Sequence, residues 1–553
     1  MFKRICFALV IVVAVFLTAC AGEAENPHTA TAPGAEIQSG AGQAGLGVQA
    51  SYTAEELVIA ITRDENTLTP FTYVTGTPGL EVLRLVFDTL FTFDLNGDII
   101  AWMVEDDFTV DRESRVFTMT LKDGQYWHDG TQLTADDVSF TFEYALIQNQ
   151  MRWRGIASQV ESIDISGNEI TITLFRGNPD FLRTGLADMP IIARHIYENV
   201  ENASYYMGPT IGSSLFRLAS YSIGRYYVLE AVEGYFRGTP TVSRINMPIM
   251  TDVAAITQAL MAGQISAATR GIGAEVIGEF EAAADIQVLS GRGFAPMMML
   301  INCERELLDD ASFRRALRYS LDIETMMVTL TLGHGTIAPP GFVIPDMLDT
   351  AAGLVHEFNP GRTNEIFDEM GLIEIGGVRQ HNNQPIAFSL LVQSGNPTRV
   401  RAAELIRGYF EEVGIILNVS SMEADTLDGL VWPGFDVSEG RDFDMAMWGW
   451  SAPVQLNPAA LIRLGMSDHS LGDLNLSGLV DSEFDALSRM FLETTVEEER
   501  DGLSRQMQAR IAELSPFINL WHDNLNFAVN TGHYGGWEFQ SSVGVINRFS
   551  FLP

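Results

Sequence analysis

From about residue 55 onward, short apolar runs alternate with segments whose apolar positions repeat every three or four residues. Residues 57–61 form a continuous apolar run that predicts a short buried strand. Further along, Thr134 and Asp137 form a variant capping box, with Asp in place of the usual Glu, and predict where a helix begins. The apolar face of that helix follows the i, i+4, i+7, i+8 spacing at Val138, Phe142, Ala145 and Leu146.

The second half of the chain shows a strand–helix–strand order. Residues 387–392 are predicted to form a strand, 397–413 a helix that ends at Gly414, and 415–419 the next strand. Two strands joined by a helix are typical of a parallel βαβ unit, so we expect an α/β fold. A later strand over 443–447 runs directly into Trp448-Gly449-Trp450.

Another helix is predicted after Asp310, which is a suitable N-cap. Its apolar face comprises Phe313, Ala316, Leu317 and Leu321. We expect the arginines between them, Arg314, Arg315 and Arg318, to lie outside in water.

The first twenty residues have the pattern of a secretion signal. Lys3 and Arg4 precede an apolar run over 5–16, too short for a spanning helix of roughly 20 residues. Leu17-Thr18-Ala19-Cys20 then resembles the bacterial lipobox. That resemblance implies cleavage before Cys20 and its acylation, so the protein would be held at the membrane, facing outside the cytoplasm. An ordinary secretory signal is the alternative.

Residues 21–50 are dominated by Ala, Gly, Glu, Gln, Thr and Pro, and we expect them to form a flexible tether. A G-x-G-x-x-G match at 40–45 lies inside this segment, but no strand precedes it, so we reject a dinucleotide site. With Cys6 removed and Cys20 acylated, only Cys303 remains, and no intramolecular disulfide is expected.

Charge and composition exclude several functions. The 553 residues include 34 Lys and Arg against 71 Asp and Glu, a net charge of −37, and the only lysines are Lys3 and Lys122. A chain this acidic lacks the basic surface of a nucleic-acid binder, and it would contact anionic membranes only through a lipid. The sequence contains no H-E-x-x-H, G-x-S-x-G or C-x-x-C motif, so we expect neither an enzyme nor a cofactor or metal.

Six segments, taken in order, resemble the large solute-binding proteins of ABC importers, the oligopeptide/dipeptide/nickel group known as family 5. The most specific runs from Leu121-Lys122-Asp123-Gly124 to Val138 and is similar to the family's LRDGVKFHDGTPLTAEDV block. The other five are residues 67–70, 260–265, 309–322, 442–450 and 499–516. Together they extend over essentially the whole body, from about Leu57 to Phe551.

The resemblance implies a two-lobed α/β fold of the periplasmic-binding-protein type (type II), whose lobes close like a hinge around a ligand. We expect residues 1–19 to be the signal peptide and 20–54 the lipidated cysteine with its tether. Lobe I would combine 55–95, 190–285 and 516–553, a small inserted domain would occupy 96–189, and lobe II would occupy 286–515.

The matching segments also imply where ligand would bind. Gly449-Trp450-Ser451 is the strongest candidate, and Trp448 and Trp450 can form an apolar wall, although either tryptophan can instead pack in a core. The weaker candidates are Tyr73, Val74, Arg270, Trp521 and His522. Arg270 can pair with a ligand carboxylate or with a surface carboxylate of this acidic chain, and His522 can be purely structural.

Peptide is the broad expectation for the ligand. In peptide-binding relatives an aspartate three residues after the tryptophan pairs with the ligand's amino group, but Pro453 stands there. Sugars, a nickel chelate or another solute are therefore alternatives. We expect a monomer that delivers its solute to an ABC permease. A peptide- or carbohydrate-cleaving surface enzyme and a surface chaperone or receptor are the alternatives from other classes.

Overall fold

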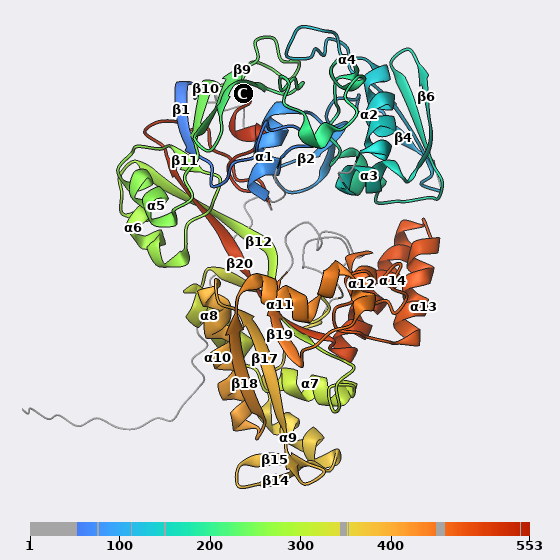
Figure 1. The fold of residues 1–553 in the computed structure, drawn as a ribbon, viewed down its shortest axis with the longest axis vertical. Helices are drawn as coiled ribbons and strands as arrows, with labels where there is room; N and C mark the ends of the chain where they lie inside the picture. The colour runs from blue at the N-terminus through green and yellow to red at the C-terminus, as the bar shows by residue number, and fades with distance from the viewer. Residues whose placement is uncertain are drawn as a thin grey trace, which may run out of the picture. The chain divides into compact units, whose positions relative to one another are not determined.

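The computed structural model describes residues 52–73, 77–111, 113–148, 151–342, 351, 353–449, 459–541 and 543–553. Residues 51–553 form one compact unit (Figure 1). The predicted signal, Cys20 and the tether lie outside the described residues, and so do Val74, Trp450, Ser451 and Pro453. No helix among the described residues has the length and hydropathy needed to span a bilayer.

The first lobe is built on a five-stranded sheet with the strand order β11-β1-β10-β9-β8. Strand β1 (Ala54–Ala60) contains most of the predicted run 57–61 and lies parallel to β10 (Val242–Pro248) and β11 (Ala267–Ala268). The antiparallel strands β9 (Tyr226–Ala231) and β8 (Phe216–Ser222) complete it. The helices of this lobe are α1 (Thr77–Val86), α4 (Arg194–Tyr197), α5 (Val253–Met261) and α6 (Ile277–Glu281).

A separate antiparallel sheet, β4-β5-β7-β6, comes from the region where we expected an inserted domain. Its strands are β4 (Thr109–Val110), β5 (Val116–Thr120), β6 (Val160–Ser166) and β7 (Glu169–Leu174), with helices α2 (Ala135–Ile147) and α3 (Met151–Ala157). The predicted capping box is confirmed, since the Asp137 carboxylate accepts a hydrogen bond from the Thr134 backbone N–H at 2.9 Å. A hairpin of β2 (Phe91–Phe93) and β3 (Ile99–Ala101) precedes this sheet.

The second lobe contains a six-stranded sheet with the order β13-β20-β12-β19-β17-β18. The predicted βαβ unit is confirmed, because β17 (Ala387–Gln393) and β18 (Ile416–Met422) pair in parallel and α10 (Pro397–Glu412) joins them. The predicted strand over 443–447 is β19 (Met445–Trp448), which also lies parallel to β17. A small sheet of β14 (Ile373–Ile375), β15 (Val378–His381) and β16 (Gln384–Pro385) extends from this lobe.

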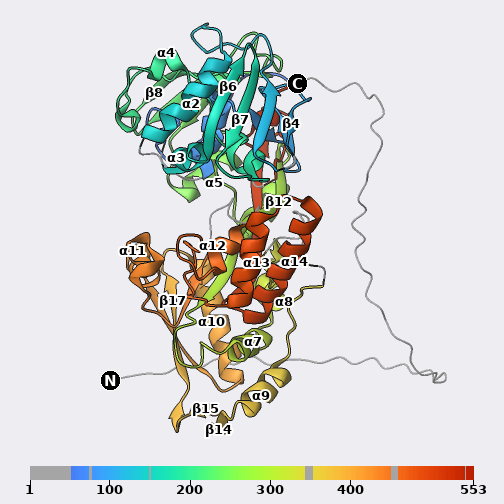
Figure 2. The ribbon, with the colours of Figure 1, turned by 90° about the vertical axis from the view of Figure 1, so that its right-hand side faces the viewer.

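Helices α7 to α14 belong to the same lobe, where α13 and α14 lie side by side and α9 packs against α7 (Figure 2). Their bounds are α7 Ala311–Tyr319, α8 Ile323–Thr331, α9 Pro360–Glu369, α10 as above, α11 Ala424–Val431, α12 Ala459–Gly465, α13 Ser482–Glu493 and α14 Glu497–Leu514. Strand β13 is Gly335–Ile337.

Two long strands, β12 (Ile286–Ile301) and β20 (Phe517–Asn530), run from one lobe to the other (Figure 1). They pair antiparallel from Ile286 opposite Asn530 to Leu300 opposite Phe517, and the ladder is irregular between Arg292 and Pro296. At one end Asn530 donates to the Ser266 carbonyl of lobe I, and at the other β12 pairs with β19 of lobe II. The expected two-lobed α/β fold is thereby confirmed, while the domain boundaries stay a prediction.

Our expectation that Arg314 and Arg318 face water was wrong. Only 2% of Arg314 and 8% of Arg318 are exposed, because both point at the C-terminal turn of α14. Arg314 donates from Nε to the Leu514 carbonyl at 2.8 Å, and Arg318 donates from Nη1 to the Ala512 carbonyl at 2.7 Å. The carbonyls at a helix end lack partners within the helix, so a buried guanidinium can satisfy them. Arg315 alone stays partly exposed, near Glu513.

Candidate functional site

The carboxyl ends of the parallel strands β17 and β19 place two groups together on lobe II. Gly449 follows β19, and the helix that follows β17 begins with the N-cap Asn396. Arg399, in the first turn of that helix, extends its guanidinium against the Gly449 backbone, where a Cβ atom would collide with Arg399 Nη2. The same Cβ would lie 2.6 Å from the Pro296 carbonyl oxygen of β12, so the close approach requires glycine at position 449.

The positive charge of Arg399 is partly buried, and neighbouring groups balance it only in part. Its Nε is enclosed, and no hydrogen-bond partner for this atom exists among the described residues. Burial lowers the pKa of Arg399, and the negative charge of Asp523 partly offsets that effect. Asp523 in turn has a raised pKa because it is buried, although it accepts a hydrogen bond from Trp521 Nε1 at 2.9 Å.

The aromatic candidates of lobe II are buried close to Gly449 in the six-stranded sheet. Trp448 retains 8% exposure and packs with the core that includes Leu461 and Phe484. Trp521 and His522 lie on β20, opposite Met297 and Pro296 of β12, and both are fully buried. Of the lobe II candidates that the structure describes, Gly449 is partly exposed to solvent, whereas the other three are buried.

Tyr73 ends the described part of the segment that follows β1 in lobe I, and its side chain is buried. Its ring centroid lies 6.4 Å from that of Trp153, whose Nε1 donates to the Pro70 carbonyl at 2.6 Å. Burial raises the pKa of Tyr73, whereas the positive charge of Arg152 acts in the opposite direction. Arg152 is held in place by two hydrogen bonds to Asp188, at 2.6 and 2.7 Å.

The start of the same segment is fixed by Asp64, which ties it to the β8–β9 hairpin. The Asp64 carboxylate accepts hydrogen bonds from the hydroxyls of Tyr221 and Tyr227, both at 2.7 Å, and from the Gly224 backbone. These donors keep the pKa of Asp64 below its ordinary value despite partial burial. The segment that carries Tyr73 is therefore positioned by hydrogen bonds from outside itself.

Arg270 lies elsewhere, just after β11, and its side chain is exposed. The next residue, Gly271, packs against β20, where a Cβ would lie 2.7 Å from the Asn526 carbonyl oxygen. The structure thus brings Gly449, Trp448, Trp521 and His522 into one region of lobe II, while Tyr73 and Arg270 belong to lobe I.

Sequence reasoning missed Arg399, Asp523 and Arg152. A signal existed for Arg399, because ligands of α/β sheets gather at the carboxyl ends of parallel strands and Arg399 follows one of them. Arg152 and Asp523 had no local signal, since their partners come from distant segments.

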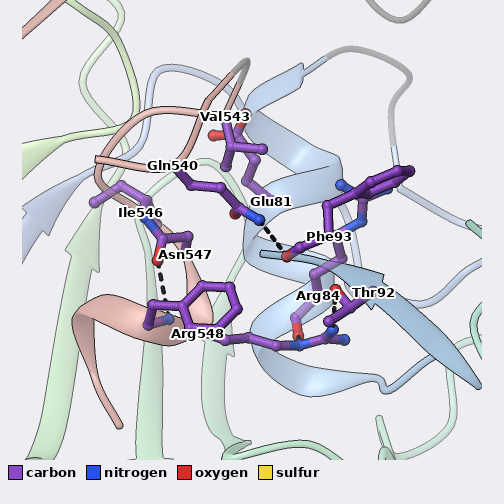
Figure 3. A pocket seen from close by; sticks show the side chains of 10 residues that line it. Glu81, Arg84, Thr92, Phe93, Gln540, Val543, Ile546, Asn547 and Arg548 are labelled. Carbon is purple, nitrogen blue, oxygen red and sulfur yellow. Dashed lines mark hydrogen bonds between the residues drawn. The ribbon is translucent and has the colours of Figure 1, made fainter. Parts of the chain in front are cut away.

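A small pocket within lobe I is distinct from these residues (Figure 3). It lies between α1, β2 and the C-terminal segment, and its lining includes Glu81, Arg84, Gln540 and Arg548. Gln540 Nε2 donates to the Phe93 carbonyl at 2.8 Å across it. None of our predicted site residues lines this pocket. Within the part of the chain that the structure describes, no group of three His, Cys, Asp or Glu side chains is arranged to hold a metal ion.

Comparison with known protein sequences relates this chain to a protein family. Residues 98–470 match the model of the bacterial extracellular solute-binding proteins, family 5, middle region. The oligopeptide-binding protein AppA of Bacillus subtilis is 23% identical over 536 residues, which cover 94% of this chain and 93% of that protein. Heme-binding protein A of Haemophilus influenzae is 22% identical, covering 82% of this chain and 84% of its own.

Solved structures share the fold. The ABC transporter substrate-binding protein CtaP of Listeria monocytogenes superposes with a TM-score of 0.80 at 22% identity, covering 90% of this chain and 99% of its own. NikZ of Campylobacter jejuni, solved with Ni(L-His), gives a TM-score of 0.69 at 22% identity over 86% of this chain and 94% of its own. Since the family model spans more than half of the sequence, the chain belongs to the family 5 bacterial extracellular solute-binding proteins.

Proposed function

We propose that this protein captures an organic solute with an anionic group, by default a peptide, between its two lobes and delivers it to an ABC permease. The observation that carries the proposal is the guanidinium of Arg399 beside Gly449, with an enclosed Nε that has no hydrogen-bond partner among the described residues. The family relationship supports the capture role, and the sequence and the geometry support the choice of solute.

An arriving carboxylate fits the chemistry of Arg399. A guanidinium forms short, charge-assisted hydrogen bonds with a carboxylate, and this one lies in the first turn of the 16-residue helix α10, where the helix dipole adds positive potential. Peptides carry such a carboxylate, and so do metal chelates built from amino acids, whereas neutral sugars do not. Among the relatives, one is named an oligopeptide-binding protein and another was solved with nickel and histidine.

The proposed cleft has one wall from each lobe. On lobe II it comprises Arg399 and Gly449 with the predicted Trp450 and Ser451, while Trp448, Trp521 and His522 support that wall from behind. On lobe I it comprises the predicted Val74 and Arg270, and the buried Tyr73 supports that wall. The segment bearing Tyr73 is fixed by Asp64, which would give the lobe I wall a defined position before solute arrives.

The first experiment is mass spectrometry of solute retained by the purified protein, followed by a thermal-shift screen. Peptides and histidine chelates are compared with amidated peptides and neutral sugars. At a ligand concentration of about 100 Kd, binding contributes about 2.7 kcal/mol to stability, so a shift in Tm is expected without turnover. A shift produced only by neutral sugars would contradict the anionic-solute proposal, and turnover would contradict capture.

The second experiment tests Arg399 directly. Arg399→Gln removes the cation and is expected to weaken binding of a carboxylate solute by about 2 kcal/mol, roughly 30-fold in Kd. The matched control is Arg401→Gln, an exposed arginine two residues further along α10. If calorimetry gives equal affinities for the two variants, Arg399 does not bind the solute.

A further inference from the structure

The contact between the inserted region and lobe II includes an ion pair between residues that are distant in the sequence. Asp180 Oδ2 lies 2.7 Å from Arg500 Nη2, and the two residues are 320 positions apart. Asp180 follows β7 and precedes a short helical turn over Leu182–Leu186, while Arg500 lies in the first turn of α14. This contact joins regions that the two long strands do not join.

Arg500 is held rigidly by lobe II. Its guanidinium carbon lies 4.0 Å from the ring centroid of Phe491, and its Nη1 donates to the Phe491 carbonyl at 3.0 Å. Its side chain is 11% exposed, and burial lowers the pKa of Arg500 while Asp180 raises it. The end of α13 therefore directs the Nη2 atom of Arg500 toward Asp180 in the inserted region.

Asp180 is positioned by its own backbone. Its N–H donates to Asn178 Oδ1 at 3.0 Å, and its carbonyl accepts from the Thr184 N–H at 2.8 Å. Beside it, a Cβ on Gly177 would lie 3.4 Å from the Thr495 methyl group, so the turn between α13 and α14 packs against this segment. The Asp180 side chain is 19% exposed, so the pair is shielded from water on both sides.

A pair in this position has a different effect from an ordinary surface ion pair. Exposed pairs contribute little, because water screens them and two mobile side chains must be ordered. Here both partners are already ordered and largely desolvated, so loss of either charge leaves the other buried without compensation. The contact is nevertheless not covalent, so it can form and break as the lobes move.

We propose that Asp180 and Arg500 form an interlobe latch, a third and reversible connection beside β12 and β20. The latch restricts the orientations that the lobes sample before solute is bound. This role rests on the proposed capture function, because a narrower ensemble reduces the ordering cost when solute draws the lobes together. The orientation of the lobes can nevertheless be measured on protein that contains no solute, so the test of the latch does not require a known solute.

The test compares three variants of the full mature chain in the absence of solute. Asp180→Asn removes the charge with little change of shape, Asp180→Lys replaces it with repulsion, and Asp107→Asn makes the same change at an exposed carboxylate of the inserted region. Hydrogen exchange is followed in peptides covering 177–187 and 491–503, and small-angle X-ray scattering gives the radius of gyration. Far-UV circular dichroism verifies folding.

We expect exchange in both peptides to rise at least threefold in Asp180→Asn and further in Asp180→Lys, with a larger radius of gyration. Asp107→Asn should match the wild type. If Asp180→Lys does not fold, Asp180→Asn decides the question alone, and wild-type exchange and scattering in that variant would overturn the latch. Since no solute is present, that result would leave solute capture standing, and failure of the solute screens would leave the latch standing.

Discussion

The carboxyl group of Glu81 lies at the wall of the small pocket in lobe I, where its Oε1 is enclosed and without a hydrogen-bond partner among the described residues (Figure 3). Burial raises the pKa of Glu81 well above its ordinary value, and the nearby Arg84 opposes this only in part. The folded protein therefore prefers the protonated form. Above the ordinary pKa of a glutamate the unfolded chain loses this proton more readily, so the contribution of Glu81 to stability falls as pH rises.

Glu81→Gln should keep the shape and remove the titration. We expect it to raise the free energy of unfolding by about 1 kcal/mol at pH 8 and to have almost no effect at pH 4. Urea unfolding at both pH values measures this difference, with the exposed Glu233→Gln as the matched control. An equal effect of Glu81→Gln at both pH values would show that the pKa of Glu81 is not raised in the folded protein.

The candidate site shows how far single residues can be predicted. Gly449 could be singled out from a short sequence match, and its close approach to Pro296 and Arg399 explains why that position has no side chain. Arg399 lies 50 residues earlier and becomes a neighbour only because β17 and β19 pair in parallel. Proximity of this kind depends on the pairing of strands that are not consecutive in the sequence, which no local pattern encodes.

At the scale of elements, patterns that act within one turn of helix were predicted well. The Thr134–Asp137 box and the Asp310 cap depend on neighbouring residues, the βαβ unit around α10 depends on the order of consecutive elements, and all three appear in the structure. Arg314 and Arg318 of α7 were misinterpreted, because polarity alone cannot distinguish a side chain in water from one bonded to buried carbonyls. Only the packing of α14 against α7 decides between them.

Adjacent arginines of α7 allow this distinction to be measured. Arg314→Met leaves the buried carbonyls of Leu514 and Leu308 without their donor, and we expect a loss of about 2–4 kcal/mol in the free energy of unfolding. Arg315→Met removes a partly exposed contact near Glu513 and a hydrogen bond to Ser312 Oγ, and it should cost less than about 1 kcal/mol. Denaturant unfolding compares the two variants, and similar losses would mean that the carbonyls find other partners.

At the scale of the whole molecule, the negative net charge of the protein limits how it can be attached to a membrane. Cleavage before Cys20 would remove Lys3 and Arg4, which takes the net charge from −37 to −39. A body with this charge is repelled by anionic headgroups, so its surface provides no electrostatic attachment. Retention at the membrane would then depend on acyl chains at Cys20, with residues 21–50 setting the distance between membrane and lobes.

Cys20→Ser separates these contributions in a bacterial host. We expect the wild type to incorporate labelled palmitate and to sediment with membranes, and Cys20→Ser to do neither and to appear in the soluble extracytoplasmic fraction. Cys303→Ser is the matched control, because burial raises the pKa of that thiol to about 11 and keeps it unreactive. If Cys20→Ser still sediments with membranes in 0.5 M salt, a protein partner rather than a lipid holds the molecule there. If the label persists as well, the acyl chain is carried by another residue.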